Sequence, residues 1–276
     1  MRVLITGVNG FIASNLARYL KSNNFEVYGT SSKKFSNIDC IKTFHMKIGD
    51  LFDVGGIHFD WAIHCVYDKT QSVENNSKST ISWAKELKKN GVKNQIFISS
   101  IRAINGNSSN YSLIKKKVET WFLKNDLNIV RPGLVVGNGG LFKKMIINVK
   151  ILPLLPIVNR GNQNVKLIGI NDLMNEINNI LINNSIKKEL NIFYLEKFIL
   201  KNVLKDIAKY YDKKVIFIQI PYFVVFYFLR AFEIFHINIG FTSVNIQGLY
   251  SKELDIKSDI KYSKDFLQIM DENFCE

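Results

Sequence analysis

Cysteine is scarce in this chain of 276 residues, which contains only Cys40, Cys65 and Cys275. The three are odd in number and far apart in the sequence. They match neither the paired framework of a disulfide-rich secreted protein nor the close spacing of a zinc site. We therefore expect no metal site and a reducing compartment, the cytoplasm.

Long uninterrupted apolar runs are also missing. The apolar start Met1–Ile5 is broken by Gly7 and Asn9 before it reaches the length of a signal-peptide core. The nearly apolar segment Pro221–Leu229, which continues to residue 239, is interrupted by Arg230, Glu233 and His236. A bilayer needs roughly 20 apolar residues in succession. We predict a buried or half-buried helix and no membrane span, with peripheral membrane contact by residues 221–239 as the minor alternative.

Acidic residues are outnumbered, 24 Asp and Glu against 37 Lys and Arg, which leaves a formal net charge of +13. The basic residues are mostly lysines scattered among asparagines and isoleucines, which indicates a compositional bias and not a nucleic-acid interface. Phosphate-bearing ligands account for part of the excess. The apolar fraction of 47% is that of a globular protein.

Short β-branched runs alternate with helical patterns in the first half of the chain. The predicted strands are Val3–Ile5, Glu26–Thr30, Thr43–Met46, Trp61–Cys65, Gln95–Ile98 and Leu127–Val130. The predicted helices are Phe11–Lys21, Ser77–Asn90 and Tyr111–Lys124. This alternation predicts an α/β fold with a doubly wound parallel sheet and right-handed crossovers, whose ligands bind at the carboxyl ends of the strands.

The pattern changes after Pro132. We predict a glycine-rich loop over residues 133–140, a short helix over 142–151 and a strand over 165–170. A helix capped by Asp172 follows, then a strand over residues 192–195. From residue 198 the chain reads as helices and loops. This part is predicted to form a smaller, mostly helical lobe.

The segment Thr6–Ala13 has the pattern of a dinucleotide-binding loop, because it follows the first strand and opens the first helix. Gly7 allows a tight turn, and Gly10 lets backbone N–H groups approach a pyrophosphate. Ala13 is small enough for close packing of helix and strand. The helix N-terminus adds partial positive charge. We therefore expect a bound dinucleotide and a Rossmann-type fold.

The end of the second strand bears on which dinucleotide is bound. A carboxylate there would hold the adenosine ribose and favour NAD. The chain has Ser31-Ser32-Lys33-Lys34 instead, which lacks a group that repels a 2′-phosphate and offers two lysines to bind one. We predict NADP(H), with NAD(H) as the alternative. Residues 1–132, with 164–195 returning to them, are the predicted NADP(H)-binding domain, and 133–163 with 196–276 the substrate-binding lobe.

At this point the chain resembles the extended short-chain dehydrogenases/reductases, the group of nucleotide-sugar epimerases, dehydratases and reductases. The matching segments are Thr6–Ile12, Gly49-Asp50-Leu51, Trp61–Cys65, Ile98-Ser99-Ser100, Tyr111–Lys115 and Arg131-Pro132-Gly133. The resemblance implies that Asp50 lies near the adenine, that Ser100 binds the substrate oxygen with Ser99 as fallback, and that Tyr111 and Lys115 are the acid–base pair. The expected cofactor contacts are Gly7, Asn9, Gly10, Phe11, Ile12, Ser31, Ser32, Lys33, Asp50, Leu51, His64, Cys65, Val66, Tyr111, Lys115 and Pro132.

The spacing of Tyr111 and Lys115 supports this pair independently, since residues four apart share a helical face. A free phenol titrates near 10, too high for acid–base chemistry at neutral pH. We expect the ammonium of Lys115 to lower the phenol's pKa. Tyr111 then exchanges a proton with a substrate oxygen while hydride moves to or from the nicotinamide.

Several reactions fit this set. The first prediction is reduction of a keto group on a nucleotide-activated sugar, a step toward a deoxysugar for surface polysaccharide. Epimerisation with tightly bound NAD is the second, and a non-catalytic sensor or structural subunit is the third. Dehydration fits less well, because Ser109 and Asn110 precede Tyr111 where related dehydratases have an acidic pair.

Two departures from the family pattern affect the substrate pose: the short stretch from Ser100 to Tyr111, and Cys65-Val66 where many relatives have alanines. A substrate diphosphate could be reached by polar residues of the second lobe, namely Asn138, Lys143, Lys144, Arg160 and Lys166. The resemblance also implies a possible homodimer.

Overall fold

The computed structural model describes all residues except 34–40, 105–108, 184–187, 236–242, 244–255 and 275–276. The chain forms two compact units. Unit 1 comprises Met1–Gly106, Asn110–Pro132 and Asp172–Leu190, and unit 2 comprises Asn107–Ser109, Gly133–Asn171 and Asn191–Glu276. The segment that returns to unit 1 is thus 172–190, shorter than the predicted 164–195. The roles of the two units as cofactor domain and substrate lobe stay a prediction.

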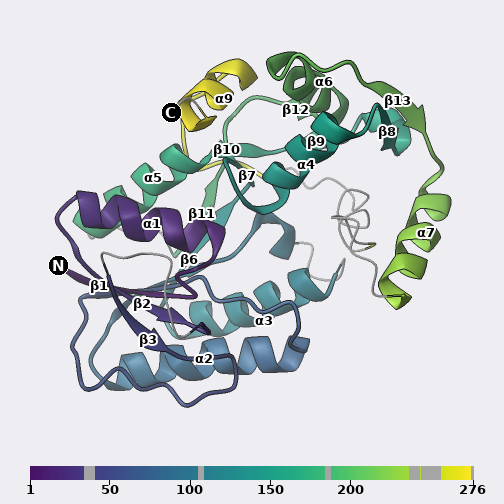
Figure 1. Ribbon diagram of the computed structural model, residues 1–276. Helices are drawn as coiled ribbons and strands as arrows, with labels where there is room; N and C mark the ends of the chain where they lie inside the picture. The colour runs from purple at the N-terminus through teal and green to yellow at the C-terminus, as the bar shows by residue number, and fades with distance from the viewer. Residues whose placement is uncertain (34–40, 105–108, 184–187, 236–242, 244–255, 275–276) are drawn as a thin grey trace. The chain divides into compact units, whose positions relative to one another are not determined.

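A seven-stranded parallel sheet is the centre of the fold, as predicted (Figure 1). Its order is β11-β6-β5-β4-β1-β2-β3. The strands are β1 (Arg2–Thr6), β2 (Glu26–Ser31), β3 (Lys42–His45), β4 (Trp61–His64), β5 (Asn94–Ile98), β6 (Asn128–Pro132) and β11 (Glu189–Ile192). The order reverses at β1, whose neighbours are β2 and β4. The carboxyl ends of β1 and β4 are therefore where a doubly wound sheet binds its ligand.

Helices cover both faces of this sheet (Figure 1). Helices α2 (Val73–Lys89) and α3 (Asn110–Lys124) pack side by side on one face. Helix α1 (Phe11–Ser22) lies on the other with α5 (Ile170–Asn183), and Tyr19 of α1 donates a 2.5 Å hydrogen bond to Asn175 of α5. Large buried side chains such as Trp83, Phe97 and Phe122 fill the space between the sheet and α2–α3.

Unit 2 is built from short strands and helices. Its strand pairs are β7 (Leu134–Val136) with β10 (Leu167–Gly169), β8 (Leu154–Ile157) with β13 (Ile216–Gln219), and β9 (Asn164–Val165) with β12 (Phe198–Ile199). Its helices are α4 (Gly140–Ile151), α6 (Leu200–Tyr210), α7 (Tyr222–Ile234) and α9 (Phe266–Phe274). Short 3-10 turns occur at Ile101–Ala103 in unit 1 and at Asn159–Gly161 in unit 2.

Four predictions about elements need correction. The glycine-rich segment 133–140 contains strand β7, because Leu134 to Val136 pair with β10. The predicted strand 192–195 lies instead at Glu189–Ile192. Helix α5 already begins at Ile170, so Asp172 lies in its first turn and does not cap it. Helix α2 begins four residues early, since the Ser72 hydroxyl accepts from the Asn75 N–H at 3.0 Å and forms the N-cap.

The apolar segment 221–239 forms helix α7 over its first part, and residues 236–239 lie outside the described residues. The predicted burial is wrong for much of this helix: Phe223, Tyr227 and Phe228 are 61%, 68% and 56% exposed, whereas Leu229 is buried. Across the described ranges, no helix combines the length and the apolarity that a membrane span requires.

Candidate active site

The loop between β1 and α1 has a backbone that only glycine fits well. Gly7 has φ +71°, in the left-handed region, and a Cβ at this position would lie 2.8 Å from the Cα of Val66. The loop is tied to β2, since Gly7 N donates to Thr30 Oγ1 at 3.1 Å and Val8 N to the Thr30 carbonyl at 2.9 Å. The close approach of β1 and β4 therefore depends on Gly7.

The start of α1 fits an anionic ligand. Gly10 occupies the N-cap position without a side-chain cap, and the first turn contains no acidic residue. The first N–H groups of a helix have no intrahelical partner, and they carry partial positive charge. Ala13 is 1% exposed, which is the close packing expected of a small residue there. A pyrophosphate is the group that suits this arrangement.

The hydroxyl of Ser31, a predicted cofactor contact, has hydrogen-bond partners within the protein. It is buried, and its hydroxyl accepts from Asn9 Nδ2 at 2.7 Å and from Lys33 N at 3.0 Å while donating to the Lys33 carbonyl at 3.1 Å. These bonds use the full capacity of a hydroxyl. Ser31 therefore holds Asn9 against the end of β2. Ser32 and Lys33 are exposed, and Lys34 lies outside the described residues.

Asp50 and Leu51 lie in the loop after β3. The Asp50 carboxylate accepts from Lys47 N at 2.7 Å, and the Asp50 carbonyl accepts from Trp83 Nε1 at 3.0 Å. The turn is thus fixed to helix α2. Leu51 is 92% exposed. The contact of Asp50 and Leu51 with an adenine stays a prediction.

The His64 side chain does not line a groove, contrary to our prediction. It is fully buried against Phe122, and its Nε2 lies 2.9 Å from Gln95 Oε1. Strand β4 turns this side chain toward α3, so only the backbone of His64 remains for a cofactor. Burial lowers the pKa of His64 to about 4, and the hydrogen bond to Gln95 offsets only part of this.

We expect this histidine to make the fold sensitive to acid. Its pKa is about 4 in the folded state and about 6.5 in the unfolded chain. Between these values the unfolded chain binds more protons, so stability falls as the pH falls from 6.5 to 4. Between pH 7 and pH 5 the loss is about 2 kcal/mol. Urea unfolding at both pH values measures it, and a stable His64→Gln variant should lose that part of the pH dependence; an equal dependence in both proteins would contradict the assignment.

Cys65 and Val66 follow β4 beside the phosphate loop. Cys65 N donates to Thr6 Oγ1 at 3.3 Å. Burial raises the pKa of the Cys65 thiol to about 12, and the nearby charge of Lys115 counters this only in part. The thiol is therefore neutral at physiological pH and behaves as a small apolar side chain.

Ser100 rather than Ser99 faces Tyr111. Ser99 is buried, and its hydroxyl has no hydrogen-bond partner among the residues described. The Ser100 hydroxyl accepts from Arg102 N at 3.3 Å, which caps the turn Ile101–Ala103, and it lowers the pKa of the nearby Tyr111 phenol. The end of β5 thus places a fixed hydroxyl beside the phenol.

The expected effect of Lys115 on Tyr111 is not found. Burial raises the pKa of Tyr111 to about 12, and the opposing influences are the charge of Arg102 and the Ser100 hydrogen bond. Lys115 Nζ donates to the Ile98 carbonyl at 2.6 Å and lies 5.6 Å from the centre of the Tyr111 ring. Its ammonium is directed at the strand and not at the phenol oxygen.

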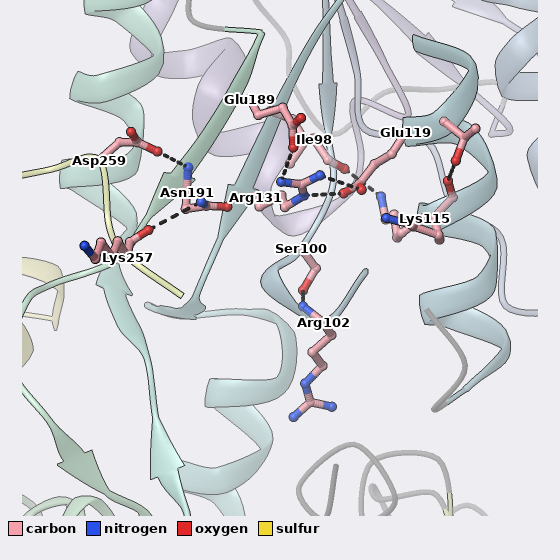
Figure 2. A network of polar contacts seen from close by, with 12 residues as sticks. Ile98, Ser100, Arg102, Lys115, Glu119, Arg131, Glu189, Asn191, Lys257 and Asp259 are labelled. Atoms are coloured by element: carbon pink, nitrogen blue, oxygen red, sulfur yellow. Dashed lines mark hydrogen bonds and ion pairs between the residues drawn. The ribbon is translucent and has the colours of Figure 1, made fainter. Parts of the chain in front are cut away.

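Two further residues belong to this group and escaped the sequence reading. Arg102 follows Ser100 by two positions, and burial lowers the pKa of its guanidinium while the nearby Tyr111 raises it. Figure 2 shows this guanidinium directed away from Ser100. The Tyr67 ring meets the Tyr111 ring edge-on at 5.2 Å between centres. The sequence signal for Arg102 was a single arginine between the predicted strand at residues 95–98 and the predicted helix at residues 111–124.

Pro132 ends β6 and is buried in unit 1. The five candidate substrate residues of the second lobe all lie in unit 2. There Lys166 Nζ donates to the Ile256 carbonyl at 3.0 Å, whereas Asn138, Lys143 and Arg160 are exposed. The structure gives Lys166 a role within its own unit.

Fold and site together define a Rossmann-type domain with a phosphate loop and a Ser–Tyr–Lys group. Residues 3–120 match the family model described as "NAD dependent epimerase/dehydratase family". No match to a curated protein sequence was found.

Solved structures share the fold at low identity. UDP-glucuronic acid 4-epimerase from Bacillus cereus, in complex with NAD, is 19% identical with a TM-score of 0.65, covering 80% of this chain and 88% of that one. The Helicobacter pylori ADP-L-glycero-D-manno-heptose-6-epimerase is 16% identical with a TM-score of 0.66, covering 79% and 85%. The NAD-dependent NDP-hexosamine 5,6-dehydratase TunA is 18% identical with a TM-score of 0.63, covering 79% and 84%.

Proposed function

We propose that this protein is an NADP(H)-dependent oxidoreductase that reduces a keto group of a nucleotide-activated deoxysugar, in the supply of surface-polysaccharide precursors. The observation that carries the proposal is the group of Ser100, Tyr111 and Lys115 in the same unit as the phosphate loop. The family of residues 3–120, and the nucleotide-sugar enzymes among the similar structures, support this substrate class.

In this proposal the dinucleotide is held by the loop Gly7–Ile12, by the turn at Asp50 and by the backbone at Cys65 and Val66. When bound, its nicotinamide supplies hydride to the substrate carbon. Gly7 and the uncapped start of α1 accommodate the pyrophosphate. We assign the nicotinamide ribose to Lys115, whose Nζ donates to the Ile98 carbonyl at the end of β5.

In the proposed reduction, a side chain of the protein supplies the proton that the substrate oxygen receives. Ser100, fixed by the Arg102 N–H, orients the substrate carbonyl oxygen, and Tyr111 donates its phenolic proton to that oxygen. The pKa of about 12 keeps Tyr111 protonated at neutral pH. This is the acid form that reduction requires, whereas the first step of epimerisation requires the phenolate as a base. The charge of Arg102 stabilises the phenolate left after the transfer.

Epimerisation with tightly bound NAD is the second candidate, since two of the three solved structures described above are epimerases. A screen of nucleotide-linked keto sugars for NADPH consumption at 340 nm separates the two. Reduction consumes one NADPH per sugar. NAD that copurifies with the protein, together with interconversion of sugars without net change in absorbance, would favour the epimerase. A protein that binds NADPH without turning over any sugar would be the non-catalytic alternative.

The cofactor preference has its own test. Lys33 is exposed after β2, and Ser31-Ser32-Lys33 contains no carboxylate. We expect tighter binding of NADPH than of NADH, and a Lys33→Ala variant should weaken NADPH binding about tenfold through the loss of a charge-assisted contact to the 2′-phosphate, with NADH binding unchanged. Fluorescence titration measures both, with the exposed Lys93→Ala as matched control. Equal weakening for the two cofactors would overturn the role of Lys33.

A further inference from the structure

Helix α3 carries a third ionisable residue on the same face as the proposed acid–base pair. Tyr111, Lys115 and Glu119 follow one another at intervals of four, which stacks them on successive turns. Lys115 and Glu119 are 4% and 1% exposed. A carboxylate at this depth is rare unless an ion pair compensates it.

Arg131, near the end of β6, supplies that ion pair (Figure 2). Its Nε and Nη2 donate to the two oxygens of Glu119 at 2.8 Å and 2.9 Å, a bidentate contact that fixes the carboxylate in place. Arg131 Nη1 lies 2.7 Å from Oε2 of Glu189 on edge strand β11. Burial by itself lowers the pKa of Arg131, but the two carboxylates outweigh it and raise that pKa.

Lys115 needs an anion nearby to stay charged. Burial lowers the pKa of its ammonium to about 8, close to physiological pH. The influences that oppose this are Cys65 and Glu119. The Cys65 thiol, with a pKa of about 12, carries no charge at neutral pH, and the same holds for the Tyr111 phenol. Among the groups that act on Lys115, Glu119 therefore supplies the negative charge.

We propose that Glu119 is a positioning residue of the active site, which holds Lys115 in its ammonium form and is itself held in place by Arg131. Its catalytic consequence rests on the proposed function, because Lys115 is the residue proposed to contact the cofactor ribose. The contacts run from Glu189 through Arg131 to Glu119 (Figure 2), and Glu119 acts on Lys115, one helical turn away, through its charge.

Turnover of Glu119→Gln as a function of pH tests the proposal. The variant should lose kcat at an alkaline pH about one unit lower than the wild type, because Lys115 deprotonates earlier. KM should stay unchanged. Glu189→Gln is the matched control, since it removes the other carboxylate on Arg131, and its alkaline limb should stay at the wild-type pH. Coincident profiles of wild type and Glu119→Gln would overturn the proposal.

A second measurement does not need turnover. Protein labelled with ¹³C at lysine Cε gives the titration of Lys115 directly by NMR, the resonance being assigned by its loss in Lys115→Met. Glu119→Gln should lower this pKa by about one unit or more, and Glu189→Gln by much less. An unchanged titration would refute the role of Glu119. If the wild type turns over no sugar, the proposed function is wrong. The NMR titration still tests the effect of Glu119 on the pKa of Lys115, because it does not depend on turnover.

Glu119→Gln leaves Arg131 partly uncompensated, which can prevent folding. The double variant Glu119→Leu, Arg131→Met then replaces it, because buried ion pairs removed as a unit are better tolerated. Its Lys115 titration should shift downward as in the single variant. A Lys115 that titrates as in the wild type in this background would equally overturn the proposal.

Discussion

Replacing Tyr111 with phenylalanine is expected to lower kcat by roughly 10² to 10⁴-fold, the contribution of a well-placed general acid. The substitution removes the phenolic hydroxyl and keeps the ring that packs edge-on against Tyr67. Folding and NADPH affinity should therefore change little. Stopped-flow measurement of NADPH oxidation at saturating substrate gives kcat, and fluorescence titration gives the affinity.

Tyr67→Phe is the matched control for this prediction. It removes a hydroxyl from the neighbouring ring without touching the proposed proton donor, so we expect a kcat within about threefold of the wild type. Full activity of Tyr111→Phe would remove Tyr111 from the chemistry. An equal loss in both variants would indicate that the two hydroxyls matter alike, and that the Tyr111 proton has no special role.

Gly7→Ala is expected to abolish dinucleotide binding, with a loss in NADPH affinity of about 100-fold or more. The added Cβ would lie 2.8 Å from the Val66 backbone, at a φ of +71° that alanine adopts only with strain. The strain and the forced separation of β1 from β4 should also cost about 1–3 kcal/mol of stability. Calorimetric titration with NADPH and urea unfolding measure the two effects.

Gly55→Ala is the control that separates the effect of backbone strain from the effect of the steric clash with Val66. Gly55 has φ +62°, but a Cβ there meets nothing within 4 Å. This control should share part of the stability loss and keep the NADPH affinity. Wild-type affinity in Gly7→Ala would contradict the placement of the phosphates at the start of α1.

The features that the sequence revealed are local ones. The phosphate loop is a continuous segment between a strand and a helix, and Tyr111 and Lys115 share a helical face whatever surrounds them. The buried strands of the parallel sheet are readable as short β-branched runs. In unit 2 the strands β7, β9, β10 and β12 have two or three residues each, too few to show a period of two.

The misassigned residues depend on contacts between distant segments. His64 follows the strand pattern, but its contacts with Gln95 and Phe122 turn it into the core. Ser31 matches a cofactor position, yet its hydroxyl is used by Asn9, 22 residues earlier. The charge that acts on Tyr111 comes from Arg102, which belongs to no segment of the family likeness. Sequence spacing gives no measure of such pairings.

The proposed reduction uses the protonated form of Tyr111, and burial, which raises the pKa of its phenol to about 12, favours that form. A protonated phenol beside a fixed serine hydroxyl is prepared to donate a proton. In the proposed role of Glu119, its buried carboxylate keeps a cation near the end of β5, where burial alone would favour the neutral form of Lys115.

The most direct test of the central claim is a single-turnover reaction of the wild-type protein with NADPH and a nucleotide-linked keto sugar, followed at 340 nm with product analysis. The account predicts loss of one NADPH for each reduced sugar formed, and near-absence of that signal in Tyr111→Phe. Formation of an epimer without loss of NADPH, or equal rates in the two proteins, would contradict it.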